Sequence, residues 1–178
     1  MTENHASLTY SSYLALDEVL QAQRPRSDEH DEMLFIVIHQ VYELWFKQML
    51  HETRFLTAAL DADDLPKVYA TLKRILTILK VQVAQIDILE TMTPVSFLSF
   101  RSRLEAASGF QSPQFRELEF LLGKRSRGMI SHHGGTAAEA RLERALGEPS
   151  LWDVFVRFLA RRGVAVPGSL LERDRAAS

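Results

Sequence analysis

Apolar residues recur along most of the chain every three or four positions, which is the spacing of an amphipathic α-helix. One long row of this kind begins after Ser27, the expected N-cap, with four acidic residues in its first turn, and runs to about Leu60. A second row runs from Leu65 to about Thr91 behind Asp64, another expected N-cap. At 1.5 Å per residue, the first helix would be about 45–50 Å long. Two long helices joined by a short turn predict an antiparallel bundle core.

Shorter helical segments flank this pair, and prolines, glycines or capping residues mark their ends. We expect helices over residues 10–23, from Thr93-Pro94 to 104, from Ser112-Pro113 to 123, 136–146 and 149–162. Thr136 and Glu139 are expected to form a capping box, and residues 124–135 a mobile loop. No segment alternates as a strand would. The predicted fold class is therefore an all-α helical bundle, one domain over residues 1–178 with a loose tail at 164–178.

The composition is that of a globular domain, with 46% apolar and 25% charged residues and a mean hydropathy of −0.10. A nucleic-acid-binding protein would usually have a basic excess, whereas 21 basic and 23 acidic residues leave a net charge of −2. Without cysteine the chain has no disulfide, thiolate metal site or iron–sulfur cluster, which fits a reducing compartment. No apolar run is long enough to cross a bilayer. We expect a cytoplasmic protein that binds neither nucleic acid nor membrane.

Histidine is the most informative reactive side chain, because phosphate-loop, zinc-protease and serine-hydrolase motifs are missing. His39 lies in an apolar stretch, where a hydrogen-bonded core histidine is the commoner outcome and a functional histidine the alternative. His39 and Glu43, four residues apart, could share a metal ion, but a simple polar contact is far commoner at this spacing. The other histidines, expected to be solvated, are His5, His30, His51, His132 and His133.

Two pairs of residues, each four positions apart, combine an aromatic ring with a polar head group. Phe35 and His39 share one face of the first long helix, and Phe97 and Arg101 share one face of a shorter helix. An aromatic wall beside a guanidinium suits a planar amino acid, since arginine binds a carboxylate with two hydrogen bonds. The spacing leaves two alternatives open, namely core packing of the rings and a surface ion pair between Arg101 and Glu105.

Four long segments of the chain resemble the tryptophan 2,3-dioxygenase family. They are LTYSSYLALDEVL (8–20), HDEMLFIVIHQVYELWFKQMLHE (30–52), LETMTPVSFLSFRSRLEAASGFQSPQFRELEFLLG (89–123) and EPSLWDVFVRFLARRGVAVP (148–167). The segments occur in the family's order and cover nearly the whole chain. The resemblance implies an all-helical haem enzyme, usually a homotetramer, that inserts both atoms of O2 across the indole C2–C3 bond of L-tryptophan. The product of that reaction is N-formyl-L-kynurenine, in the kynurenine pathway of tryptophan catabolism.

The resemblance also implies a substrate pocket. His39 matches the distal histidine that meets the indole N–H, and Phe35 matches the aromatic wall of the indole pocket. Arg101 matches the arginine that grips the substrate carboxylate, and Phe97 falls where family members carry Tyr or Phe. The residues between Phe35 and His39, also assigned to substrate binding, are Ile36, Val37 and Ile38.

Two further segments match parts of the family that contact the cofactor or a neighbouring subunit. Ser108 and Gly109 match a loop beside the haem. Tyr10, Tyr13 and Leu14 match an N-terminal helix that reaches into a neighbour's pocket. The family's proximal haem histidine and the loop that closes over the substrate follow the matched segments. The resemblance thus implies haem but no metal ligand in this sequence, and we expect the chain to correspond to the N-terminal, distal part of the enzyme.

Two other functions stay open at this point. A truncated or naturally shortened family member would lack activity and act as an interaction module, because its apolar helix faces would favour association. A related haem enzyme would act on another aromatic amino acid or an indole, and Phe97 in place of a tyrosine does not decide this. A haem absorbance spectrum separates the interaction module from the enzymes, and product analysis with tryptophan separates the two enzymes.

Overall fold

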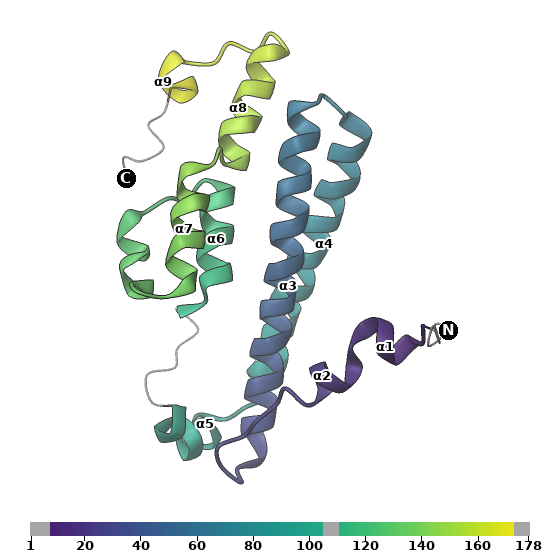
Figure 1. Ribbon diagram of the computed structural model, residues 1–178, viewed down its shortest axis with the longest axis vertical. Helices are drawn as coiled ribbons and strands as arrows, with labels where there is room; N and C mark the ends of the chain where they lie inside the picture. Colours follow the sequence, from purple (N-terminus) through teal and green to yellow (C-terminus); the bar gives the residue numbers. More distant parts are fainter. Residues whose placement is uncertain (1–7, 105–110, 173–178) are drawn as a thin grey trace, which may run out of the picture.

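The computed structural model describes residues 8–104 and 111–172, and every regular element within these ranges is helical (Figure 1). The all-α prediction is confirmed for this part of the chain. The α-helices are α1 (Tyr10–Leu14), α2 (Leu16–Leu20), α3 (His30–Asp61), α4 (Leu65–Leu89), α5 (Pro94–Arg101), α6 (Pro113–Leu122), α7 (Ala137–Gly147), α8 (Leu151–Arg161) and α9 (Gly168–Leu171). Short 3₁₀ turns cover η1 (Ser102–Leu104), η3 (Arg127–Met129) and η4 (Ser131–His133).

Helix α3 is the central element of the fold. Helix α4 runs antiparallel along one side of it, while α6 and α8 contact it on the other side and α7 packs on α6 (Figure 1). At 32 residues α3 is about 48 Å long, as the sequence predicts. The Tyr42 hydroxyl donates to the Gln82 carbonyl oxygen at 2.5 Å and so fixes how α3 and α4 align. Helix α5 contacts α3 near its N-terminal end, which brings two of the predicted site segments together.

Two clusters of buried apolar side chains hold these helices together. The larger cluster joins α3, α4, α6 and α8 around fully buried residues such as Met49, Leu56 and Val154. The smaller one joins α6, η3 and α7 around Phe120 and Leu142, both without exposed surface. Burying side chains of this size stabilises the fold by about 1.5–3 kcal/mol each.

Several predicted helix ends are confirmed. The Asp64 carboxylate accepts from the Lys67 backbone N–H at 3.3 Å, and the Thr93 hydroxyl accepts from that of Ser96 at 3.1 Å. Helix α6 ends at Gly123, whose φ of +116° favours glycine. A Cβ added there would lie 3.0 Å from the Trp152 Cβ, so the close approach of α6 and α8 also favours a glycine.

Two predictions near the N-terminus are wrong. The helix expected over residues 10–23 is two short helices, because Ala15 adopts a left-handed conformation with φ of +49° and interrupts the hydrogen bonding. Ser27 is not the N-cap of α3; that position belongs to Glu29, whose side chain makes no cap hydrogen bond. Instead, Ser27 donates from its backbone and its hydroxyl to the buried carboxylate of Glu32.

Two predictions for residues 124–139 also need correction. Thr136 and Glu139 do not form a capping box: the Thr136 hydroxyl donates to the His133 carbonyl oxygen, and the Glu139 carboxylate accepts from the Gly135 N–H. The segment expected as a mobile loop contains η3 and η4, and its Arg125, Ile130 and His133 are buried. The prediction of a solvated His133 is therefore wrong, because Ile130, three residues earlier, holds this segment against the buried cluster of Phe120 and Leu142.

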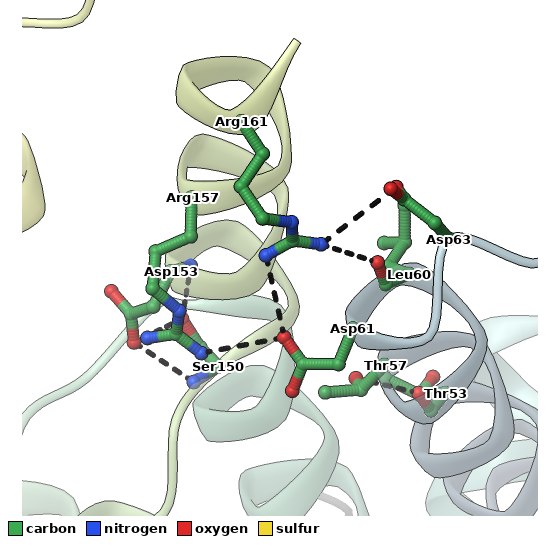
Figure 2. A network of polar contacts seen from close by, with 9 residues as sticks. All are labelled: Thr53, Thr57, Leu60, Asp61, Asp63, Ser150, Asp153, Arg157 and Arg161. Carbon is green, nitrogen blue, oxygen red and sulfur yellow. Dashed lines mark hydrogen bonds and ion pairs between the residues drawn. The ribbon is translucent and has the colours of Figure 1, made fainter.

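The turn between α3 and α4 is held from the side by α8. Figure 2 shows Arg157 and Arg161 of α8 pointing toward this turn. Arg161 donates to the Leu60 carbonyl oxygen at 2.7 Å and lies 3.9 Å from the Asp61 and Asp63 carboxylates. One arginine thus satisfies a carbonyl at the C-terminus of α3, where positive charge is favourable.

The segment after α8 begins with Gly163, which has φ of +81°. Helix α9 follows and contacts α8, within the range where the sequence predicts a loose tail. In the residues that the structure describes, no helix is both long enough and apolar enough to cross a membrane.

Candidate functional site

Three phenylalanine rings from α3 and α5 form one aromatic cluster. The Phe35 centroid lies 5.8 Å from that of Phe97 and 5.7 Å from that of Phe100, and the latter two are 5.6 Å apart in an edge-to-face arrangement. These separations are typical of favourable aromatic pairs, worth about 0.5–1.5 kcal/mol each beyond their burial. Phe100 has no exposed surface, whereas Phe35 and Phe97 are half-buried. Phe100 therefore anchors α5, and the other two rings keep accessible surface.

His39 extends this cluster along α3. Its ring centroid lies 4.1 Å from that of Phe35, one turn earlier. Its Nδ1 is 2.7 Å from the Phe35 carbonyl oxygen, which can only accept, so Nδ1 carries the proton. In the neutral ring Nε2 then keeps its lone pair as an acceptor, and it has no partner among the described residues. The half-buried His39 thus presents one hydrogen-bond acceptor beside an aromatic wall.

Arg101 completes the arrangement from α5. Its guanidinium carbon lies 5.4 Å from the Phe97 ring centroid, within the range of a cation–π contact. The side chain is exposed, and no acidic residue in the described ranges pairs with it. Glu105, its alternative partner by spacing, lies outside the described residues. The structure therefore brings Phe35, His39, Phe97 and Arg101 together. That these four residues face a substrate cavity stays a prediction.

The other predicted site residues are placed as follows. Ile38 is buried, Ile36 is half-buried, and Val37 is exposed and lines a groove of about 620 Å³ with His39, between α3 and the α2 segment. Tyr10 and Tyr13 are exposed by 76% and 72%, and Leu14 is also exposed. Helices α1 and α2 project away from the helical body (Figure 1), which leaves these side chains free of intramolecular packing. Ser108 and Gly109 lie outside the described residues.

Glu32 positions the start of α3, three residues before Phe35. Its carboxylate is buried and accepts from the backbone N–H groups of Arg26 and Ser27, each at 2.8 Å, and from the Ser27 hydroxyl at 2.5 Å. The hydrogen bond from the Ser27 hydroxyl is the main cause that holds the pKa of Glu32 below its ordinary value. Desolvation of the carboxylate raises this pKa, whereas the two backbone hydrogen bonds and the positive charge of Arg103 lower it further. The sequence interpretation missed this contact. Its signal was a glutamate three residues after the helix N-cap, the position from which a carboxylate reaches back to free N–H groups.

Other polar groups near His39 make no metal site. Glu43 accepts from the Gln114 side chain at 2.8 Å, and among the described residues it makes no hydrogen bond or ion pair with His39. In residues 8–104 and 111–172 no group of three or more His, Asp or Glu side chains is arranged to hold a metal ion.

The described residues fit a haem group only in part. His39 is the one imidazole in the aromatic cluster of the described chain. His51 lines a different hollow, His30 and His132 are exposed, and His133 is buried in η4. The described residues therefore provide aromatic and polar groups for one face of a planar ligand and no second imidazole for an iron atom across it. They do not form a complete haem-binding set.

Comparison with known proteins agrees with this geometry. The model of a family described as tryptophan 2,3-dioxygenase matches residues 1–144. Tryptophan 2,3-dioxygenase of Anaeromyxobacter sp. (strain K) is 59% identical over 163 residues, which cover 91% of this chain and 62% of the relative. The enzymes of the same name from Herpetosiphon aurantiacus and Caulobacter vibrioides are 54% and 48% identical over 94% of this chain and 65% and 64% of their own lengths.

This chain spans less than two thirds of the length of these relatives. The matched region nevertheless contains α1 to α6, and with them His39, Phe35, Phe97 and Arg101. Because the family model covers well over half of the sequence, the chain belongs to the tryptophan 2,3-dioxygenase family.

Proposed function

We propose that the cluster of Phe35, His39, Phe97 and Arg101 is the substrate-binding side of a haem-dependent tryptophan 2,3-dioxygenase, which oxidises L-tryptophan with O2 to N-formyl-L-kynurenine. The observation that carries this proposal is the cluster itself, in which an aromatic wall, an acceptor and a guanidinium lie together, the last two without a partner in residues 8–104 and 111–172. Family membership supports the reaction class. The cytoplasmic location, the haem and the homo-oligomeric assembly are parts of the same proposal.

The indole ring would bind against the accessible faces of Phe35 and Phe97. Stacking of this kind favours a flat apolar ring, and His39 Nε2 adds an acceptor for the one N–H donor that indole carries. The Nδ1 bond to the Phe35 carbonyl oxygen both sets this tautomer and restrains the ring. His39 therefore orients the substrate, and in the neutral form its Nε2 is available to hold the indole proton.

Arg101 would bind the carboxylate of the amino acid. Its exposure and its lack of an acidic partner in the described ranges leave its N–H donors available, and the contact with Phe97 restrains the side chain. A bidentate bond to a carboxylate fixes direction as well as affinity, so the indole and the carboxylate together define one orientation. Haem, when bound, would supply the activation of O2, and the roles proposed for His39 and Arg101 are confined to holding and orienting the substrate.

The test is equilibrium binding of three ligands to the full chain. L-Tryptophan carries both recognised groups, tryptamine lacks the carboxylate, and 1-methyl-L-tryptophan lacks the indole N–H. Arg101→Gln should weaken L-tryptophan binding about tenfold or more and leave tryptamine unchanged. His39→Ala should weaken L-tryptophan more than 1-methyl-L-tryptophan.

The control for these variants is Arg127→Gln, an exposed arginine of η3 whose nearest carboxylate lies at 3.9 Å. This change should leave the affinities for L-tryptophan and tryptamine unchanged. Equal losses for tryptamine and L-tryptophan in Arg101→Gln would contradict the assigned role of the guanidinium.

A second candidate function, an interaction module without activity, is favoured by the surface of α4. This helix exposes a row of apolar side chains, and the most exposed are Tyr69, Leu76 and Val83, at 69%, 57% and 67%. Such a row favours association with another helix. Light scattering of the chain mixed with a complete tryptophan 2,3-dioxygenase tests this candidate. A complex that Val83→Glu abolishes would support it, and two unchanged separate species would exclude it.

A further inference from the structure

A second hollow, of about 540 Å³, lies between α3, α6 and α7 and is lined largely by charged side chains. Its volume falls in the range of small-molecule binding sites. Lys47 and Arg54 line it from α3, and Arg141 and Arg144 line it from α7. Spacings of seven and three residues keep each pair on one helix face, so both pairs point into the same space. The hollow therefore has a basic wall on each side.

A buried carboxylate fixes two of these arginines. Glu117 of α6 is only 3% exposed, and it binds Arg54 Nη2 at 2.5 Å and Arg141 Nε at 2.9 Å. Each guanidinium has five N–H donors in a rigid plane, so one contact to Glu117 leaves others available at the hollow. Arginines that are already held lose less conformational entropy when they bind a ligand. Glu117 thus prepares a rigid pair of donors that belong to different helices.

The remaining charges leave the hollow positive. Lys47 and Arg144 are exposed and have no ion-pair partner within the described ranges. Glu148 is the other acidic side chain of the lining, so four basic and two acidic residues leave a formal charge of about +2 with His51 neutral. An uncompensated positive charge in a concave surface concentrates anions. The charge and the donors point to the same kind of ligand.

We propose that this hollow binds a small phosphate compound with at least two negative charges, of the organic diphosphate type. Two basic walls that face each other suit two anionic groups, and guanidinium forks match the oxygen geometry of phosphate. The volume is many times that of a single water molecule, which occupies about 30 Å³, so the site accommodates more than one phosphate group. This site is separate from the aromatic cluster, although Lys47 and Gln114 also line the groove beside His39.

Titration calorimetry of the full chain with pyrophosphate, orthophosphate and succinate tests this assignment. Pyrophosphate should bind saturably at one site, more tightly than orthophosphate. Lys47→Gln and Arg144→Gln should each weaken pyrophosphate about five- to tenfold. Both side chains are exposed and form no ion pair with another described residue, so folding should be unaffected, which a circular dichroism melt of each variant checks. The matched control is Lys80→Gln, an exposed lysine of α4 outside the lining, which should leave the affinity unchanged.

Three results would overturn the proposal. The first is no saturable binding of pyrophosphate. The second is an equal loss of affinity in Lys80→Gln, which would indicate attraction to the whole surface rather than to a site. The third is succinate binding as tightly as pyrophosphate, which would show that the site does not select phosphate.

Discussion

The contact between Glu32 and the segment before α3 gives the sharpest prediction for stability. Replacing Glu32 by glutamine keeps the size of the side chain and removes its negative charge. In the native chain one carboxylate oxygen accepts from the Arg26 N–H at 2.8 Å, and the other accepts from the N–H and the hydroxyl of Ser27. A glutamine can offer only one of these two oxygens, so at least one donor must face an NH₂ group.

The magnitude follows from this count. The amide can keep the two Ser27 contacts by pointing its oxygen toward them, and then the Arg26 N–H loses its acceptor in a buried site. Hydrogen bonds to a charged group contribute about 1.5–3 kcal/mol, and the bonds that remain also lose their charge assistance. We expect Glu32→Gln to lower the free energy of unfolding by about 2–3 kcal/mol, a large share of the 5–15 kcal/mol of an ordinary domain.

The same contact predicts a pH dependence of known sign. The pKa of Glu32 in the folded chain lies below its ordinary value of 4.5, so the folded state binds the proton more weakly than the unfolded state. The stabilisation is therefore fully present above about pH 4.5 and is lost as the pH falls through the folded pKa. The difference in unfolding free energy between the native chain and Glu32→Gln should be constant near neutral pH and should shrink in acid.

Urea denaturation followed by circular dichroism measures both effects. The matched control is Glu29→Gln, which makes the same chemical change at the exposed N-cap of α3, where the side chain makes no cap hydrogen bond. It removes a similar interaction with the helix dipole and should cost under about 1 kcal/mol. The reasoning would be refuted if Glu32→Gln and Glu29→Gln had the same free energy of unfolding. It would also be refuted if the difference in unfolding free energy between the native chain and Glu32→Gln grew below pH 4.5.

Three further predictions concern the cofactor, the N-terminus and the core. Because His39 is the one imidazole in the aromatic cluster of the described residues, the chain should retain haem weakly and form little N-formylkynurenine; a stable one-to-one haem complex with turnover would contradict this. Deleting residues 1–14 should reduce self-association in light scattering and change the melting temperature little, since Tyr10 and Tyr13 are exposed by 76% and 72%; unchanged assembly would count against an intersubunit role. Leu56→Ala should cost about 2–5 kcal/mol in urea denaturation, and Leu76→Ala under about 0.5 kcal/mol; equal losses would contradict the burial of Leu56.

The sequence alone determined the features that depend on neighbours within about one helical turn. The periodicity defined α3 and α4, and Asp64, Thr93 and Ser112 marked helix starts because each side chain caps N–H groups three residues away. The same local geometry placed Phe35 beside His39 and Phe97 beside Arg101. These contacts need no knowledge of the rest of the fold, since a helix fixes which residues share a face.

Only the tertiary structure decided which of these faces meet. The contact between Phe35 and Phe97 joins residues 62 positions apart and exists because α5 packs on α3, with Phe100 buried beneath. His133 is likewise buried although Ser131, His132 and Gly134 beside it in sequence are polar or small, so a prediction from its neighbours along the chain was wrong. Desolvation and long-range pairing are properties of segments brought together in space, and a pattern along one segment carries no information about the element that covers it.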